Sequence, residues 1–128
     1  MNAARWAEIA QRYRALRVAV LGDFCLDRYL EIDPMRAETS IETGLDVYNV
    51  VRVRAQAGAA GTILNNLVAL GIGKIHALGC CGDDGEGYEL RRSLDQLSGV
   101  DRSRFITAAN RHTFTYCKPL VLTSGQPP

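Results

Sequence analysis

Hydrophobic and polar residues follow two different periods along the chain, and the changes of period mark out its elements. In residues 2–16, apolar side chains recur at every third or fourth position between charged ones, which predicts an amphipathic helix docked on the edge of a domain. Residues 17–22 form a short apolar run that ends at glycine, and residues 74–78 form another that precedes one. Both runs predict strands that are buried on two faces, as in a parallel sheet.

The second half of the chain adds helices and strands in alternation. In order, they are a mostly buried helix over 62–70, a helix over 83–97, a strand over 104–108 and a strand over 113–122. In the last strand, we expect Phe114, Tyr116 and Val121 to point inward. Asp83 and Glu86 are spaced as a capping box at the start of the second helix. Together with Asp84 they could also hold a metal ion, but the capping interpretation explains them without one.

Residues 30–54 have a different character, because charges, Pro34 and Gly44 interrupt the apolar pattern. They predict two irregular, half-exposed strands apart from the core. The whole order of elements therefore predicts an α/β protein: a Rossmann-like parallel sheet with flanking helices, plus a small β-sheet appendage. The core would comprise residues 1–29 and 58–112, with the appendage strands within 30–57 and 113–123.

Composition and charge narrow the function classes. The 128 residues suffice for one domain, and 15 basic against 14 acidic side chains leave no basic patch for nucleic acid. Residues 55–73 carry no charge, yet their amides and glycines argue against a membrane span. The four cysteines lack zinc-ligand spacing, and no apolar stretch of a signal peptide precedes them. We therefore expect reduced thiols in a cytoplasmic protein, without a metal site.

The motifs leave one candidate site. Neither a P-loop nor a dinucleotide fingerprint is present, and the two histidines, His76 and His112, fit packed or solvated positions. By contrast, Asp27 follows the first predicted strand, and residues 58–61 form a Gly-Ala-Ala-Gly turn that opens a helix. A carboxylate opposite free backbone N–H groups suits vicinal hydroxyls. The residues thus favour a sugar or polyol site, with a purely structural turn as the alternative.

The same residues resemble a known family. The motifs are Gly-Asp-Phe-Cys-Leu-Asp-Arg-Tyr at 22–29, the turn at 58–61, Asn-Leu-Val-Ala-Leu-Gly at 66–71 and the glycine-rich stretch at 79–87. In this order they resemble the N-terminal half of ribokinase-like (PfkB-type) carbohydrate kinases, and the first motif is most similar to the heptose-phosphate kinase branch. The resemblance implies a Rossmann-like domain with a β-sheet lid over the sugar. It also implies ATP-dependent phosphoryl transfer to a carbohydrate hydroxyl, with ATP and Mg²⁺ as cofactors.

The resemblance also suggests roles for individual residues. Asp27 would bind sugar hydroxyls, and Gly58 would offer its backbone to the sugar as the first glycine of the family's pair. Two substrate-binding positions depart from the family: Ala59 replaces the second glycine, and Thr62 stands where an asparagine is usual. Both departures bear on which sugar or sugar phosphate binds.

The family's general base lies in a Gly-Ala-Gly-Asp motif, and this chain has no such motif. We therefore expect no catalytic residue and no nucleotide site in it, so that it would be an N-terminal part of a longer kinase and inactive alone. The alternative is a non-catalytic α/β module that binds a ligand or a partner. Because relatives often dimerise through the lid, we also expect a homodimer, for which the apolar residues of the lid segments would form one face.

Overall fold

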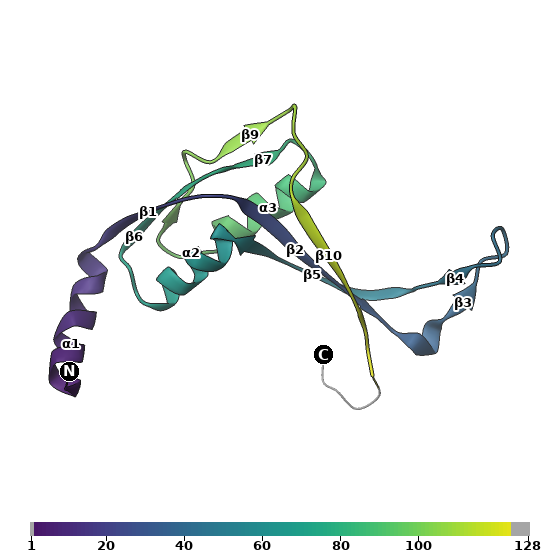
Figure 1. The fold of residues 1–128 in the computed structure, drawn as a ribbon, viewed down its shortest axis with the longest axis horizontal. Helices are drawn as coiled ribbons and strands as arrows, with labels where there is room; N and C mark the ends of the chain where they lie inside the picture. The colour runs from purple at the N-terminus through teal and green to yellow at the C-terminus, as the bar shows by residue number, and fades with distance from the viewer. Residues whose placement is uncertain (1, 124–128) are drawn as a thin grey trace.

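The N-terminal helix is formed as the sequence predicts, but it stands away from the core. The computed structural model describes residues 2–123, beginning with α1 (Ala3–Gln11) and the 3₁₀ helix η1 (Arg12–Ala15). The Asn2 side chain caps α1 by accepting from the Arg5 N–H at 2.9 Å. No residue of α1 is buried, and the helix projects from the rest of the chain (Figure 1). The predicted docking is therefore limited to the C-terminal end of α1, where Ala10 and Gln11 line a cavity with Ala69 and Leu70 at the end of α2. The following η1 is joined to the core through the Tyr13 carbonyl, which accepts from the Gly73 N–H.

A parallel sheet with two flanking helices forms the core, which confirms the predicted α/β class. Only one face of the sheet is buried, because Val20, Ile75 and Ala77 are covered while Leu21 is 81% exposed, so the prediction of strands buried on two faces is wrong. Its strands are β1 (Arg17–Leu21), β6 (Lys74–Leu78) and β8 (Val100–Asp101), in the order β1-β6-β8. A second parallel pair joins β7 (Cys80–Gly82) to β9 (Ile106–Ala108). The flanking helices are α2 (Ala60–Ala69) and α3 (Gly85–Asp95).

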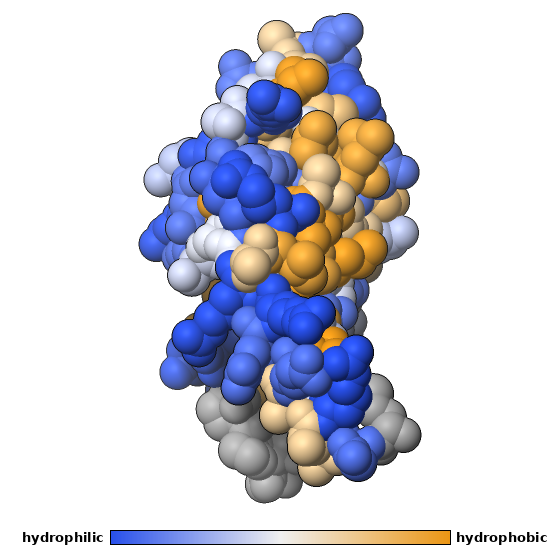
Figure 2. Space-filling model, turned by 90° about the vertical axis from the view of Figure 1, so that its left-hand side faces the viewer, coloured by the Kyte–Doolittle hydropathy of each residue, from blue (hydrophilic) through white to orange (hydrophobic). Residues whose placement is uncertain are grey.

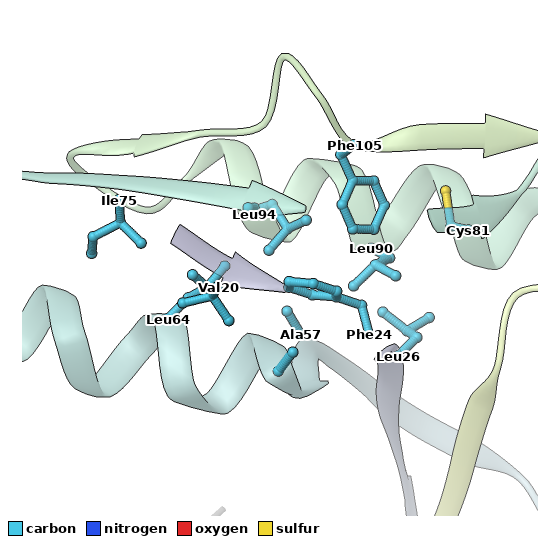
Figure 3. Packing of buried hydrophobic residues seen from close by; sticks show 12 residues of the cluster. Val20, Phe24, Leu26, Ala57, Leu64, Ile75, Cys81, Leu90, Leu94 and Phe105 are labelled. Carbon is cyan, nitrogen blue, oxygen red and sulfur yellow. The ribbon is translucent and has the colours of Figure 1, made fainter. Parts of the chain in front are cut away.

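The hydrophobic core lies between these two helices (Figure 3). Leu64 from α2, Leu90 and Leu94 from α3, and Ile75 from β6 are all fully buried. Phe24 enters the same cluster, where its ring meets the ring of Phe105 edge to face at 5.0 Å. The helical periods recognised in the sequence thus bury their apolar stripes against the sheet.

A second sheet extends away from this core (Figure 1). It contains β10 (Thr115–Val121), β2 (Phe24–Ile32) and β5 (Val50–Ala59), in the order β10-β2-β5, and we call it the lid sheet. The strand β2 pairs antiparallel with β5 and parallel with β10. At the far end lie η2 (Pro34–Arg36) and the short hairpin of β3 (Glu38–Thr39) and β4 (Asp46–Val47).

Two strands of the lid sheet, β2 and β5, are longer than the sequence predicts. Asp27 was expected at the tip of the first buried strand, whereas it lies inside β2, because the chain turns at Gly22 and Asp23 and at once forms a new strand. Phe24, Cys25 and Leu26 at the start of β2 are buried, while the strand continues into the lid without a break. Both β2 and β5 therefore run across the predicted boundaries between core and lid.

The pairing register separates two faces of the lid sheet. Side chains alternate along a strand, and paired residues share a face. Tyr116 is paired with Asp27, whereas Val121 is paired with Ile32, five residues further along β2 and hence on the opposite face. The prediction that Phe114, Tyr116 and Val121 point inward is wrong, because all three are 51–59% exposed. The expectation that the apolar lid residues form one face is also wrong, because Tyr116 and Val121 lie on opposite faces.

The start of α3 also differs from expectation. The helix begins at Gly85, so Asp84 rather than Asp83 occupies the N-cap position. The Asp84 Oδ1 accepts from the Gly87 N–H at 2.7 Å and from the Thr113 hydroxyl at 2.6 Å, while Oδ2 accepts from the Thr113 N–H at 2.8 Å. Glu86 makes an ion pair with Arg28 of β2 instead of completing a capping box. Asp84 thus joins α3 to the segment that leads into β10.

Within residues 2–123, none of the helices is long and apolar enough to cross a membrane. All four cysteines are free thiols. Figure 2 shows a hydrophobic patch on the side of the molecule that carries α1, at the height of the core layer and bordered by polar residues.

Candidate functional site

Asp27 lies where the lid sheet leaves the core, and its carboxylate is only 14% exposed. It is the fourth residue of β2 and is paired with Gln56 on β5 and Tyr116 on β10. Its Oδ1 accepts from the Nζ of Lys118 at 2.7 Å. A carboxylate oxygen that is not engaged by this cation can accept further hydrogen bonds.

Gly58 lies beside Asp27 on the neighbouring strand. A Cβ built on Gly58 would be 2.6 Å from Oδ2 of Asp27 and 2.7 Å from Sγ of Cys25. Any side chain at position 58 would therefore collide with the carboxylate. Because Gly58 has no side chain, the Asp27 carboxylate can occupy this space. Burial raises the pKa of the Cys25 thiol, and the neighbouring Asp27 charge raises it further, so this thiol is in its neutral form.

Ala59 ends β5 and serves as the N-cap of α2. Its backbone has φ +53° and ψ −117°, and among the residues described it is the one non-glycine residue with positive φ. Glycine adopts this conformation readily, whereas a Cβ makes it costly. A glycine at position 59 would therefore adopt this backbone conformation at a lower cost. No side chain caps α2, and the Ala60 N–H is occupied by the carbonyl of Asp23 at 3.0 Å.

Thr62 is the third residue of α2 and is exposed. In residues 2–123 no hydrogen bond engages its hydroxyl, nor does any join it to Asp27. The structure therefore brings Asp27 and Gly58 into direct proximity and leaves Ala59 and Thr62 at the adjoining end of α2. Contact with a ligand stays a prediction for all four residues.

A cavity lies beside this group rather than over it. It measures about 830 Å³ and opens at the carboxyl ends of β1 and β6. Asp23, Phe24, Cys80, Arg111 and His112 are among its lining residues, while the four predicted site residues are not. Ligands of open α/β sheets bind outside the carboxyl ends of the strands, so the cavity has the position expected for a substrate cleft.

Sequence reasoning missed the residues that surround Asp27 on its own face of the lid sheet. Lys118 lies over the ring of Tyr29, with Nζ 4.8 Å from the ring centroid, and Arg54 approaches the same ring to 4.9 Å. Arg54 also pairs with buried Glu31 at 2.6 Å. The hydrogen bond to Asp27 raises the pKa of Lys118, which keeps its charge. The register of β10 against β2 brings Lys118 to Asp27 and Tyr29, and the register of β5 brings Arg54 to Tyr29; no motif encodes either register.

Known proteins resemble this chain in sequence and in fold. No family model matches the chain. It is 37% identical over 116 residues to the bifunctional protein HldE of Syntrophotalea carbinolica, a match that covers 90% of this chain and 22% of that protein. With HldE of Citrifermentans bemidjiense it shares 38% identity over 87 residues, covering 67% and 17% respectively. The chain thus spans about a fifth of the length of these curated relatives.

Solved structures share the fold. A carbohydrate kinase from Agrobacterium tumefaciens superposes with a TM-score of 0.59 and 23% identity, over 82% of this chain and 31% of the kinase. Aminoimidazole riboside kinase from Salmonella enterica gives 0.54 and 22%, over 80% and 28%. A further structure of that enzyme, with a TM-score of 0.51 and 22% identity over 80% of this chain and 28% of its own, holds aminoimidazole riboside and an ATP analog. Together with the curated relatives, these matches confirm the predicted resemblance to ribokinase-like carbohydrate kinases.

Proposed function

We propose that this chain supplies the sugar-binding half and the lid of a carbohydrate kinase of the ribokinase type, which transfers phosphate from ATP to a sugar hydroxyl. The observation that carries the proposal is the close approach of Asp27 to Gly58, where a mostly buried carboxylate occupies the space that a side chain at position 58 would need. The likeness to HldE and to ribokinase-like structures supports the same class. Because the motif at residues 22–29 is most similar to the heptose-phosphate kinase branch, heptose phosphates are among the substrates to be tested.

In this proposal, Asp27 accepts hydrogen bonds from hydroxyls of the sugar and so fixes the sugar's orientation. Gly58 and the end of α2 offer backbone groups, and Thr62 can donate and accept through its hydroxyl. Phosphoryl transfer depends mostly on positioning and on neutralising charge. The residues of this chain would perform the positioning. We propose that the general base and the sites for ATP and Mg²⁺ belong to a part of the kinase outside this chain. The enzyme would be cytoplasmic.

The test is a phosphorylation screen of the complete encoded protein with ATP and a panel of sugars, sugar phosphates and nucleosides. At least one compound should accept phosphate. Asp27→Asn, which keeps the shape of the side chain, should lower kcat/KM at least about tenfold without changing the urea midpoint of unfolding. The matched control is Asp46→Asn on the exposed strand β4, which should leave both unchanged.

Two results would contradict the proposal in different ways. If no compound accepts phosphate, the kinase function is wrong, and the alternative of a non-catalytic binding module gains support. If Asp27→Asn lowers the urea midpoint of unfolding but the folded variant retains full activity, Asp27 is a structural residue and not a ligand for the sugar.

We further propose that the complete protein is a homodimer formed through the lid sheet. Val53 and Val121 lie on the face opposite Asp27, because they pair with Leu30 and Ile32 of β2. These two side chains are 49% and 59% exposed. A small sheet whose apolar side chains face solvent is a natural surface for a second copy.

A further inference from the structure

Lys118 extends from β10 across the lid sheet and meets Asp27, although the two residues lie 91 positions apart in the chain. The Lys118 Nζ donates to Oδ1 of Asp27 at 2.7 Å and to the Tyr29 hydroxyl at 3.4 Å. It also lies 4.8 Å from the ring centroid of Tyr29 and 5.9 Å from that of Tyr116. Two aromatic rings and one carboxylate therefore hold the ammonium in place.

This arrangement leaves one donor and one acceptor unused, side by side. An ammonium carries three hydrogens, of which Asp27 and Tyr29 take two. In residues 2–123, no hydrogen bond reaches Oδ2 of Asp27, which lies beside the backbone of Gly58. The Asp27 side chain is 14% exposed and the Lys118 side chain 39%, so both still reach solvent.

A donor beside an acceptor fits the chemistry of neighbouring hydroxyls. Each sugar hydroxyl can donate one hydrogen and accept another, so one hydroxyl can donate to Oδ2 while the adjacent oxygen accepts from Nζ. The ion pair is neutral overall, so it attracts a neutral diol rather than an anionic group. Tyr29 and Tyr116 add apolar ring surface beside it, which suits the carbon face of a sugar.

We propose that Lys118 is a substrate-binding residue, which works with Asp27 to recognise two adjacent hydroxyl oxygens of the sugar. This inference rests on the proposed kinase function and extends it to the lid. It makes β10 part of the binding site, so that the lid recognises the substrate directly in addition to covering it. Discrimination between sugars would then depend on the relative orientation of two neighbouring hydroxyls.

The experiment uses the complete encoded protein and the best substrate from the sugar panel. Lys118→Met keeps the apolar stem but removes the donor, and it should raise KM about tenfold or more while kcat changes less. Lys118→Arg should restore part of the affinity. The control Lys74→Met removes a lysine that pairs with Asp101 on the core at 3.4 Å, and it should leave KM unchanged.

Monodeoxy analogues of the substrate separate direct contact from an indirect effect. For the wild type, removal of the hydroxyl that Lys118 recognises should also raise KM about tenfold, and in Lys118→Met the same removal should have little further effect. If Lys118→Met leaves KM within about twofold of the wild type, or if the losses multiply for every deoxy analogue, the proposal for Lys118 is overturned while the kinase function stands. If the wild type phosphorylates none of the sugars, the proposed function itself is wrong.

Discussion

A side chain at Gly58 of β5 would need the space that the Asp27 carboxylate of β2 occupies. An added Cβ at position 58 would approach Oδ2 of Asp27 to 2.6 Å, well below the distance of an ordinary contact. The carboxylate is also held from its other side by Lys118 at 2.7 Å, so it cannot move away without losing that hydrogen bond. The site therefore depends on a residue that contributes no side chain.

Gly58→Ala should disturb both stability and binding. Overpacking of a filled site costs about 1–3 kcal/mol, and the shift of Asp27 should weaken sugar binding by about tenfold or more. Urea unfolding and the KM of the sugar measure the two effects. The control is Gly85→Ala, because a Cβ there meets nothing within 4 Å. Normal stability and KM in Gly58→Ala would show that the close approach does not matter in solution.

Ala59→Gly should stabilise the protein. The positive φ of Ala59 carries a strain of about 1–3 kcal/mol, whereas glycine adds an entropic cost of about 0.5–1 kcal/mol. We expect a net gain of about 1 kcal/mol in the free energy of unfolding, measured in urea. The same change one residue further, Ala60→Gly, should instead destabilise, since Ala60 is buried in the first turn of α2. Equal effects of the two substitutions would contradict the strain at Ala59.

Asp84 should make stability depend on pH. Hydrogen bonds from Thr113 hold the pKa of Asp84 below its usual range, so the folded state favours the ionised form. Its contribution is complete above the unfolded pKa of about 4 and is lost as pH falls through the lower, folded pKa. Between pH 5 and 7, Asp84→Asn should be about 1–3 kcal/mol less stable than the wild type.

The stability gap between the wild type and Asp84→Asn should close below about pH 4, as seen by urea unfolding from pH 2.5 to 7. Exposed Asp83 offers a matched control, and Asp83→Asn should leave the unfolding free energy nearly unchanged at every pH. A gap for Asp84→Asn that stays constant down to pH 2.5 would contradict the role of its charge.

The proposed dimer can be tested on the face opposite Asp27. Val53→Lys combined with Val121→Lys would bury two unpaired charges in the interface, and the dissociation constant should rise at least about tenfold. Sedimentation velocity over a range of concentrations measures it. Ile106→Lys is the control, because Ile106 is 63% exposed on β9 of the core. A monomeric wild type, or a dimer that tolerates both charges, would refute the lid interface.

The helices and the core sheet were accessible to sequence reasoning because their hydrophobic periods are local. Leu90 and Leu94 are spaced as the buried stripe of a helix, and both are fully buried. The sequence places the cap of α3 one residue too early, because Asp84 is held at the N-cap by hydrogen bonds from Thr113, which lies 29 positions away in the chain. A local pattern indicates where a helix starts, but it does not determine which of two adjacent aspartates occupies the N-cap position.

The candidate site could be predicted only in part. Asp27 and Gly58 belong to motifs, and the structure brings them together. Lys118 belongs to no motif, and its position follows from the parallel register that sets Tyr116 opposite Asp27. Pairing between strands that are distant in sequence is decided by packing of the whole fold, which no short pattern encodes.

The continuity of β2 has a mechanical consequence. Phe24 anchors one end of the strand in the hydrophobic core, and the same strand carries Asp27 and then reaches Ile32 at the far end of the lid. In the middle of the strand, Arg28 makes ion pairs with Glu86 and Glu89 of α3 at 3.3 and 3.2 Å. Because residues 24–32 form one continuous strand, a tilt of the lid would have to bend or twist β2 itself. Asp27 lies only three residues from Phe24 on this strand, so a shift of the backbone at Asp27 would also disturb the packing of Phe24 against Phe105.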